Sequence, residues 1–208
     1  MNAQHRSAPV TLALAGLLLA AASATATAAP VIGQPAPDFT VPDAAGTPVK
    51  LSEFRGKTVV LEWTNPGCPF VAKHYDSGNM QGLQKTWGGK DVVWLSISST
   101  NPRSSDYQKP DQLAALWKKQ GAAPRALLMD DDGKVGRLYS ARTTPHMYVI
   151  DPKGTLVYAG GIDDKRTTNV ADVKTAKNYV TAALTEVTAG KPVSTATATP
   201  YGCSVKYN

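Results

Sequence analysis

The sequence contains very few cysteines and histidines for its length. Two cysteines and three histidines occur among its 208 residues, and the histidines show no zinc-binding spacing. No glycine-rich phosphate-binding loop is present either. With only two cysteines, the chain can form one intramolecular disulfide, between Cys68 and Cys203. We therefore expect no resident cofactor and no metal.

The positive charges form no cluster. The formal net charge is +6, but the lysines and arginines are scattered and are not interleaved with aromatic residues. Proteins that bind nucleic acid usually carry a basic patch or stripe on one face. We interpret the charge as a solvated surface and expect no nucleic-acid partner.

The N-terminus has the order of a secretory signal peptide. Arg6 precedes an uncharged apolar run from Val10 to Ala22, which is too short to span a bilayer comfortably. Small residues follow, and we expect cleavage after Ala28, so that residues 1–28 are the signal peptide. A retained signal anchor is the alternative. The mature chain, with a net charge of +5 after the loss of Arg6, would be exported to the periplasm or secreted, without stable membrane insertion.

Beyond residue 30, strand-like and helix-like segments alternate. Strands are expected at 39–41, 48–51, 59–61, 92–97, 126–129, 147–150 and 156–159, and helices at 69–76, 80–87, 110–120, 135–139 and 173–187. This order predicts one α/β domain over 29–190, with helices on both faces of the sheet and an N-terminal hairpin. The polar stretch 98–109 is long for a loop and is therefore a candidate functional loop.

The C-terminal segment 191–208 is expected to be a tail that carries Cys203. Its first part, 191–200, is rich in threonine, alanine and serine. That composition is typical of a flexible tether. A ten-residue tether of this kind would let Cys203 cross one face of the domain and reach Cys68.

Cys68 stands at a predicted strand-to-helix turn. It follows the apolar stretch 58–63 and precedes Pro69, which suits the first position of a helix. The amides of a helix N-terminus lack intrahelical partners, and together with the helix dipole they favour a thiolate. We therefore predict that the thiol pKa of Cys68 is lowered and that Cys68 is alkylated faster than Cys203.

Several motifs together resemble one protein family. These motifs occupy 32–39, 51–57, 59–63 and 65–71. They are similar to redoxins of the alkyl hydroperoxide reductase/thiol-specific antioxidant type, and the motif at 65–71 is similar to a branch with Cys-x-x-Cys-Pro before the helix. The resemblance covers 31 to about 190 and implies a thioredoxin-like fold with a central mixed sheet. It also implies that Thr144–Pro145 is the cis-proline bond of that fold, beside the active cysteine.

The chain departs from the family pattern at two positions. Asn65 replaces the first cysteine of Cys-x-x-Cys, so Cys203 or an outside thiol would have to resolve a mixed disulfide. Peroxiredoxins carry an arginine where this chain has Pro145, which favours a thioredoxin-like interpretation of that position. Arg142 and Arg125 are candidates to replace that arginine.

Four other sites allow two interpretations each. Glu62 could be the buried acid that moves protons beneath the cysteines of thioredoxin-like proteins, or it could face water. His146 could approach Cys68 as a base or ion-pair partner, although a solvent-facing position is favoured. His74 is expected on the surface, with a metal role as the alternative. Asp130–Gly133 is interpreted as a solvated turn, because it lacks the ligand spacing of a calcium loop.

Three classes of function follow from these residues. The leading one is an exported thiol oxidoreductase that uses Cys68, Cys203, Pro145 and Glu62. Its partner would be a peroxide or a thiol or disulfide partner protein. The second is a non-catalytic thioredoxin-fold module with a structural Cys68–Cys203 disulfide. The third is a copper-handling protein, which the absence of a second nearby cysteine disfavours.

Overall fold

The computed structural model describes Met1 and residues 29–207, so the predicted signal peptide lies, apart from Met1, outside the described residues. The strands are β1 Thr40–Pro42, β2 Pro48–Lys50, β3 Thr58–Trp63, β4 Val92–Ser98, β5 Ala126–Met129, β6 Thr143–Thr144, β7 His146–Ile150, β8 Leu156–Gly160 and β9 Cys203–Ser204. The helices are η1 Leu51–Phe54, α1 Pro69–Asp76, α2 Asn79–Gly88, α3 Pro110–Lys119, α4 Lys134–Leu138, η2 Val170–Thr175 and α5 Tyr179–Thr188. None of these helices is long and apolar enough to cross a membrane.

The central sheet has the strand order β5-β4-β3-β7-β8. β3 pairs in parallel with β4 and antiparallel with β7, which makes the sheet mixed. Every residue of these three strands is buried, as expected for strands covered on both faces. β1 and β2 form an N-terminal hairpin. The predicted fold class is therefore confirmed.

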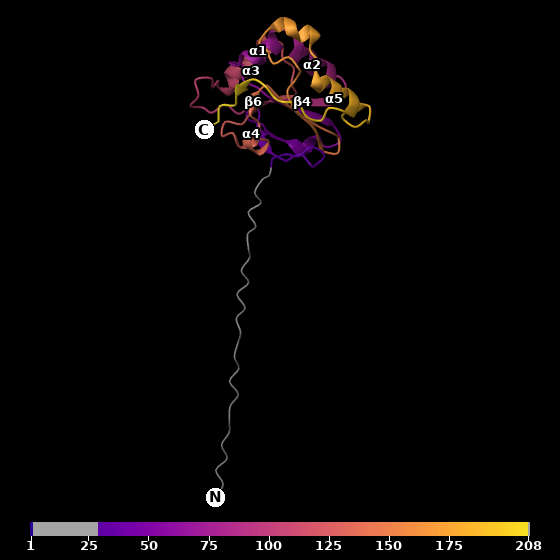
Figure 1. Ribbon diagram of the computed structural model, residues 1–208. Helices are drawn as coiled ribbons and strands as arrows, with labels where there is room; N and C mark the ends of the chain where they lie inside the picture. Colours follow the sequence, from indigo (N-terminus) through magenta and orange to yellow (C-terminus); the bar gives the residue numbers. More distant parts are fainter. Residues whose placement is uncertain (2–28, 208) are drawn as a thin grey trace.

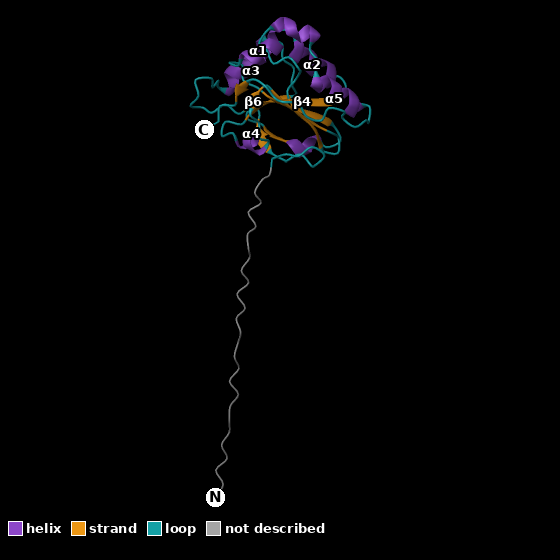
Figure 2. Cartoon of the chain, viewed as in Figure 1, coloured by secondary structure: helices purple, strands orange, loops and turns teal. Residues whose placement is uncertain are grey.

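Different elements cover the two faces of this sheet (Figure 1). On the helical face, α1, α2, α3 and α5 pack over a core that includes Val60 and Trp94. On the hairpin face, the β1–β2 hairpin, η1 and α4 cover Leu61 and Trp63. Because side chains alternate along a strand, Glu62 shares the helical face with Val60. Figure 2 shows the orange sheet between the purple helices.

The last helix is shorter than predicted. The sequence pattern placed its inward face from Val173 onwards, but Val173 lies in η2 and α5 begins only at Tyr179. Asn178 precedes α5, and its side chain accepts the Thr181 amide at 2.8 Å. Such a cap satisfies a free amide at a helix start and competes with continuation of the helix towards the N-terminus.

The C-terminal tail packs along the sheet instead of forming a loose tether. In Figure 1 it is the yellow segment that leaves α5 and crosses towards β6. The Ala159 amide donates to the Ala196 carbonyl at 3.1 Å, and the Ala198 amide donates back to Ala159 at 3.3 Å. Gly160 permits this contact, because a Cβ there would lie 2.2 Å from the Ala198 carbonyl oxygen. These hydrogen bonds fix a segment whose composition alone predicts flexibility.

Candidate active site

Cys68 lies at the predicted strand-to-helix turn. It is the residue before α1, is 1% exposed and has an extended backbone. Its carbonyl accepts the amides of Val71 and Ala72, each at 2.9 Å, and Pro69 occupies the first helical position. On the other side, the Cys68 amide donates to the Asn65 carbonyl at 3.0 Å. The turn therefore fixes the Cys68 backbone from both directions.

The Cys68 sulfur has two polar partners, and neither belongs to α1. The thiol donates to the Thr144 carbonyl at 3.0 Å, and the Cys203 amide donates to the sulfur at 3.4 Å. The side chain makes no capping hydrogen bond with its own helix. We predicted that the helix amides would be the N–H donors near this sulfur, whereas in the structure the tail supplies the donor.

The Thr144–Pro145 bond is cis, as predicted, and lies beside Cys68. Thr144 pairs with Cys203 in the short antiparallel ladder of β6 and β9. Gly202 makes this pairing possible, because its φ is +138° and a Cβ there would lie 2.0 Å from the Thr144 carbonyl oxygen. The cis-proline turn, Cys68 and Cys203 of the tail thus meet at one place.

The surroundings of the Cys203 thiol disfavour its ionisation. Both are free in this structure. Burial, and then the hydrogen bond and the charge of Cys68, raise the pKa of the Cys203 thiol to about 12. Such a thiol stays protonated at neutral pH, and the thiolate is the nucleophilic form. Cys203 is therefore a weak nucleophile in the reduced protein.

Glu62 is completely buried on the helical face, which is one of the two positions that its strand allowed. Its carboxylate accepts hydrogen bonds from Trp94 Nε1 and Ser96 Oγ, each at 2.8 Å. The Tyr75 hydroxyl donates at 3.0 Å and the Gln84 amide at 3.3 Å. Burial raises the pKa of Glu62, and these donors oppose that shift. Glu62 is therefore a buried group that can hold or release a proton.

The prediction that His74 lies on the surface was wrong. His74 is fully buried, and its Nε2 lies 3.2 Å from the hydroxyl of Tyr201 in the tail. Helical spacing explains the position, because His74 comes three residues after the buried Val71 on the same side of α1. Burial lowers the pKa of His74 to about 4.

The favoured interpretation of His146, a solvent-facing position, was also wrong. It does not face solvent, since it is 5% exposed. Its Nδ1 accepts the Arg142 amide at 3.3 Å and lies 3.2 Å from the Tyr148 hydroxyl, so these groups and not Cys68 are its partners. Burial lowers the pKa of His146 to about 3.

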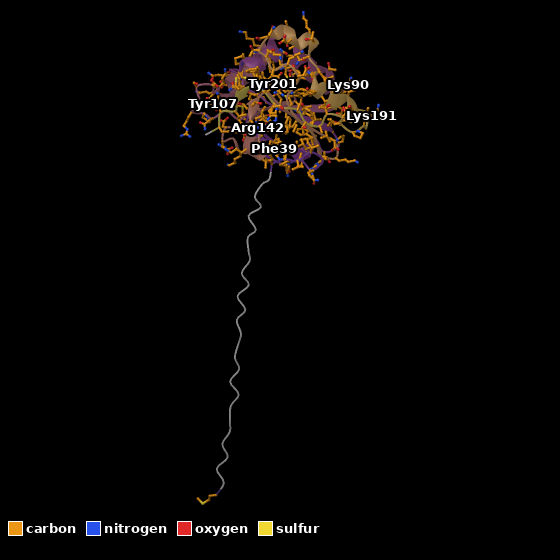
Figure 3. All side chains as sticks on the ribbon, in the orientation of Figure 1. Phe39, Lys90, Tyr107, Arg142, Lys191 and Tyr201 are labelled. Atoms are coloured by element: carbon orange, nitrogen blue, oxygen red, sulfur yellow. The ribbon has the colours of Figure 1, made fainter. Side chains whose placement is uncertain are left out.

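Neither arginine candidate is brought to Cys68. Arg142, which is labelled in Figure 3, is exposed, and it borders a surface pocket with His146 and the tail. Arg125 precedes β5, near the opposite end of the sheet from the Cys68 turn. No hydrogen bond or ion pair in the described residues joins either arginine to Cys68.

The interpretation of Asp130–Gly133 as a solvated turn was wrong for Asp130. Its carboxylate is buried and accepts the amides of Val135 and Gly136 at 3.0 and 2.8 Å. The Ser99 hydroxyl donates to it at 2.5 Å. Asp130 therefore satisfies amides at the start of α4. Within residues 29–207, no group of three or more histidine, cysteine or acidic side chains could hold a metal ion.

The loop after β4 places near the Cys68 turn a residue, Asp106, that the sequence analysis did not single out. Asp106 accepts the Asn65 side-chain amide at 3.5 Å and lies 3.8 Å from the Lys206 ammonium. The Asn101 amide donates to the Lys206 carbonyl at 2.8 Å. Loop length marked this segment as a candidate, but no local pattern marks Asp106 itself.

The fold and the paired thiols define a thioredoxin-like redoxin, and comparison with known proteins gives its family. The model of the AhpC/TSA family matches residues 32–159. The chain belongs to this family.

Individual relatives agree with that assignment. A Mycobacterium tuberculosis protein called "Putative peroxiredoxin" is 30% identical over 143 residues, which cover 61% of this chain and 82% of the relative. A Helicobacter pylori protein of similar name is 31% identical over 114 residues, covering 53% of this chain and 66% of the relative. The crystal structure of a hypothetical protein from Sinorhizobium meliloti has a TM-score of 0.71 at 26% identity, covering 86% of this chain and 95% of that chain.

Proposed function

We propose that this protein is an exported thiol oxidoreductase that cycles between a Cys68–Cys203 dithiol and the corresponding disulfide. The observation that carries the proposal is the contact between the two cysteines, in which the Cys203 amide donates to the Cys68 sulfur. Family membership and the names of the relatives support thiol chemistry. The substrate would be a peroxide or a disulfide, of a partner protein or a small molecule, and the reductant would be a dithiol.

With a peroxide, the cycle has three steps. The Cys68 thiolate attacks one peroxide oxygen, the O–O bond breaks, and Cys68 becomes a sulfenic acid while the second oxygen leaves and is protonated. Cys203 then attacks the Cys68 sulfur, the S–S bond forms, and the sulfenic hydroxyl leaves as water with the proton of Cys203. An external dithiol reduces this disulfide, is itself oxidised, and restores both thiols.

With a disulfide substrate, the first two steps differ. The Cys68 thiolate attacks one sulfur of the substrate, a mixed disulfide forms, and one substrate thiol leaves. Cys203 attacks the Cys68 sulfur of the mixed disulfide and releases the second substrate thiol. In both versions Cys203 acts after Cys68, and the raised pKa of Cys203 supports this order. Glu62 would exchange protons within the buried helical face, and Pro145 would form one wall of the site.

Single-turnover reactions of the reduced protein test this proposal. Wild type, Cys68→Ser and Cys203→Ser are mixed with one equivalent of hydrogen peroxide or of a small disulfide, and the products are identified by mass. We expect wild type to lose two hydrogens through an internal disulfide and Cys203→Ser to stop at one modified thiol. Cys68→Ser should form neither product. The substrate that reacts faster identifies the reaction class.

A structural disulfide is the competing function, and the same proteins separate it from the redox cycle. A structural bond resists reduction, with a potential below about −300 mV, whereas a working bond is poised higher. If wild type consumes neither substrate faster than Cys68→Ser, and its disulfide has such a low potential, the redox cycle is wrong.

Export is part of this proposal and has its own test. Arg6 and the apolar run after it support a cleaved signal over residues 1–28. Expression of the full chain in a bacterial host, followed by fractionation and intact mass, should yield a periplasmic form that begins at Ala29. A protein retained at full length in the membrane fraction would favour the signal anchor.

A further inference from the structure

A group of buried polar side chains beside the Cys68 turn has no role in the proposed redox cycle. Lys73 and His74 of α1 meet Asp163, which follows β8. All three side chains are almost completely buried. The Lys73 ammonium lies 3.7 Å from Asp163 Oδ2 and donates to the Lys165 carbonyl at 2.6 Å. Buried charges are costly unless they are paired. The burial of this group therefore needs a structural or functional reason.

Hydrogen bonds connect this group of side chains to one residue of the tail, Tyr201. The Asn79 side-chain amide donates to His74 Nδ1 at 2.9 Å, so the proton of the neutral ring is on Nε2. Nε2 donates to the Tyr201 hydroxyl oxygen at 3.2 Å, and that hydroxyl donates to Asp163 Oδ1 at 2.5 Å. The tail hydroxyl is thus a member of a directed chain of hydrogen bonds that ends on a carboxylate. Hydrogen bonds to a charged group are stronger than neutral ones.

The Tyr201 ring is held as well as its hydroxyl. It packs edge-on against Phe70 with ring centroids 5.9 Å apart, and the Lys73 ammonium lies 5.5 Å from its centroid. These contacts come from the helix that begins directly after Cys68. The same helix therefore places Cys68 at its N-terminus and receives Tyr201 on its side, with Tyr201 only two residues before Cys203.

We propose that Tyr201 is a positioning residue whose anchorage between α1 and Asp163 holds Cys203 against Cys68. The proposal rests on the proposed function, because it assigns Tyr201 to the step in which Cys203 attacks Cys68. Gly202, between the anchor and the cysteine, lies directly against the Thr144 carbonyl, and Cys203 itself pairs with Thr144 in the β6–β9 ladder. The ordering of the tail is therefore complete before Cys203 reacts, which raises its effective concentration at Cys68.

The tail offers a matched control on the other side of Cys203. The Tyr207 hydroxyl donates to the Ala141 carbonyl at 2.7 Å, which is a neutral hydrogen bond four residues beyond Cys203. Tyr201→Phe and Tyr207→Phe each remove one tail hydroxyl and keep the ring. The proposal requires unequal effects, because only the Tyr201 hydroxyl is bonded to a buried carboxylate.

Reaction with dithiobis(nitrobenzoate) measures the step directly. The Cys68 thiolate attacks the probe and releases one thionitrobenzoate, and Cys203 then attacks the mixed disulfide and releases a second, with its proton passing to solvent. We expect Tyr201→Phe to slow the second release about tenfold, as loss of a charge-assisted hydrogen bond would. Because Cys68 becomes more accessible, the first release should become faster. Tyr207→Phe should change both rates less than about threefold.

The redox potential of the pair provides a second measurement. A tenfold lower effective concentration of Cys203 makes the disulfide easier to reduce and raises its potential by about 30 mV. Near-equal melting temperatures of the two variants would show that global destabilisation is not the cause. If Tyr201→Phe matches wild type in the second release and in potential, or if Tyr207→Phe changes them equally, Tyr201 is not the anchor. If wild type itself never releases the second thionitrobenzoate, the proposed function fails and the anchor fails with it.

Discussion

The two faces of the central sheet bury the acidic side chains of Glu62 and Asp130 in different ways: Asp130, on the hairpin face, accepts backbone amides, whereas Glu62 accepts side-chain donors alone. On the helical face, Glu62 and His74 are bonded to other side chains, which come from separate helices and strands. On the hairpin face, the buried Asp130 accepts two backbone amides as well as the Ser99 hydroxyl. Three rings pack there with centroids 5.2 to 5.4 Å apart, those of Trp63, Tyr139 and Tyr148.

This difference predicts that the two faces of the sheet have different roles, one in thiol chemistry and the other in stability. A bond between two side chains can be rearranged when one of them gains or loses a proton, whereas a capped backbone amide has no such freedom. Cys68 packs into the core of the helical face. We therefore expect substitutions on the helical face to change the thiol chemistry and its pH dependence, and substitutions on the hairpin face to change stability alone.

The largest expected effect is the loss of thiol chemistry in Cys68→Ser. This variant should lose all turnover of peroxide and disulfide, because the one remaining thiol, Cys203, has a raised pKa and stays protonated at neutral pH. Its melting temperature should stay within a few degrees of that of the reduced wild type, since serine replaces one buried atom. Stopped-flow substrate consumption and a thermal scan measure the two quantities. Residual turnover above the uncatalysed rate would contradict the assignment.

The second prediction concerns the hairpin face. Trp63→Ala should lower the free energy of unfolding by about 3–5 kcal/mol, because it removes a fully buried ring and leaves a cavity. Urea unfolding measures this loss. At a temperature where the variant remains folded, the release of thionitrobenzoate should match that of wild type. A slowed release would mean that the two faces are not separate.

The third prediction uses the two buried histidines. Burial lowers the pKa of His74 from 6.5 to about 4, so the unfolded chain binds the proton more readily and stability is lost as pH falls through this window. His74 alone should account for a loss of about 3 kcal/mol, which His74→Gln should remove. The measurement is urea unfolding at pH 7, 5.5 and 4.

His146 supplies the matched control for this prediction. Its pKa is lowered to about 3, so His146→Gln should also reduce the acid sensitivity of folding. Only His74→Gln should slow the second release of thionitrobenzoate, because only His74 touches Tyr201. If the second release is slowed equally in the two variants, the predicted difference between the two faces of the sheet is wrong.

The smallest expected effect is that of Glu62→Gln on the pH dependence of stability. Burial raises the pKa of Glu62 above 4.5, so the folded state binds the proton more tightly and stability is lost as pH rises through the folded pKa. Wild type should therefore lose stability relative to Glu62→Gln as pH rises from 4, by at most about 1.4 kcal/mol per pH unit. Parallel stability curves would show that Glu62 ionises normally.

Much of the fold could be predicted from local patterns. The apolar strands, the helix after Cys68 and the hairpin at the N-terminus follow from periodicity and from proline and glycine positions. The Thr144–Pro145 bond was also predicted, from the family resemblance. The last helix was predicted too long, because Asn178 caps α5 through a side-chain hydrogen bond that periodicity does not report. The two histidines were misplaced, although the spacing of His74 from Val71 already indicated a buried face.

The sequence by itself determined the order of elements, the turn that presents Cys68 and the presence of a second thiol near the C-terminus. Tertiary structure alone decided where the tail lies, because its hydrogen bonds join residues that are far apart in the chain. The Cys203 amide reaches Cys68 across 135 positions, and Tyr201 reaches His74 across 127. Composition records only the flexibility of an isolated segment, whereas the order of this tail comes from buried partners on α1 and after β8.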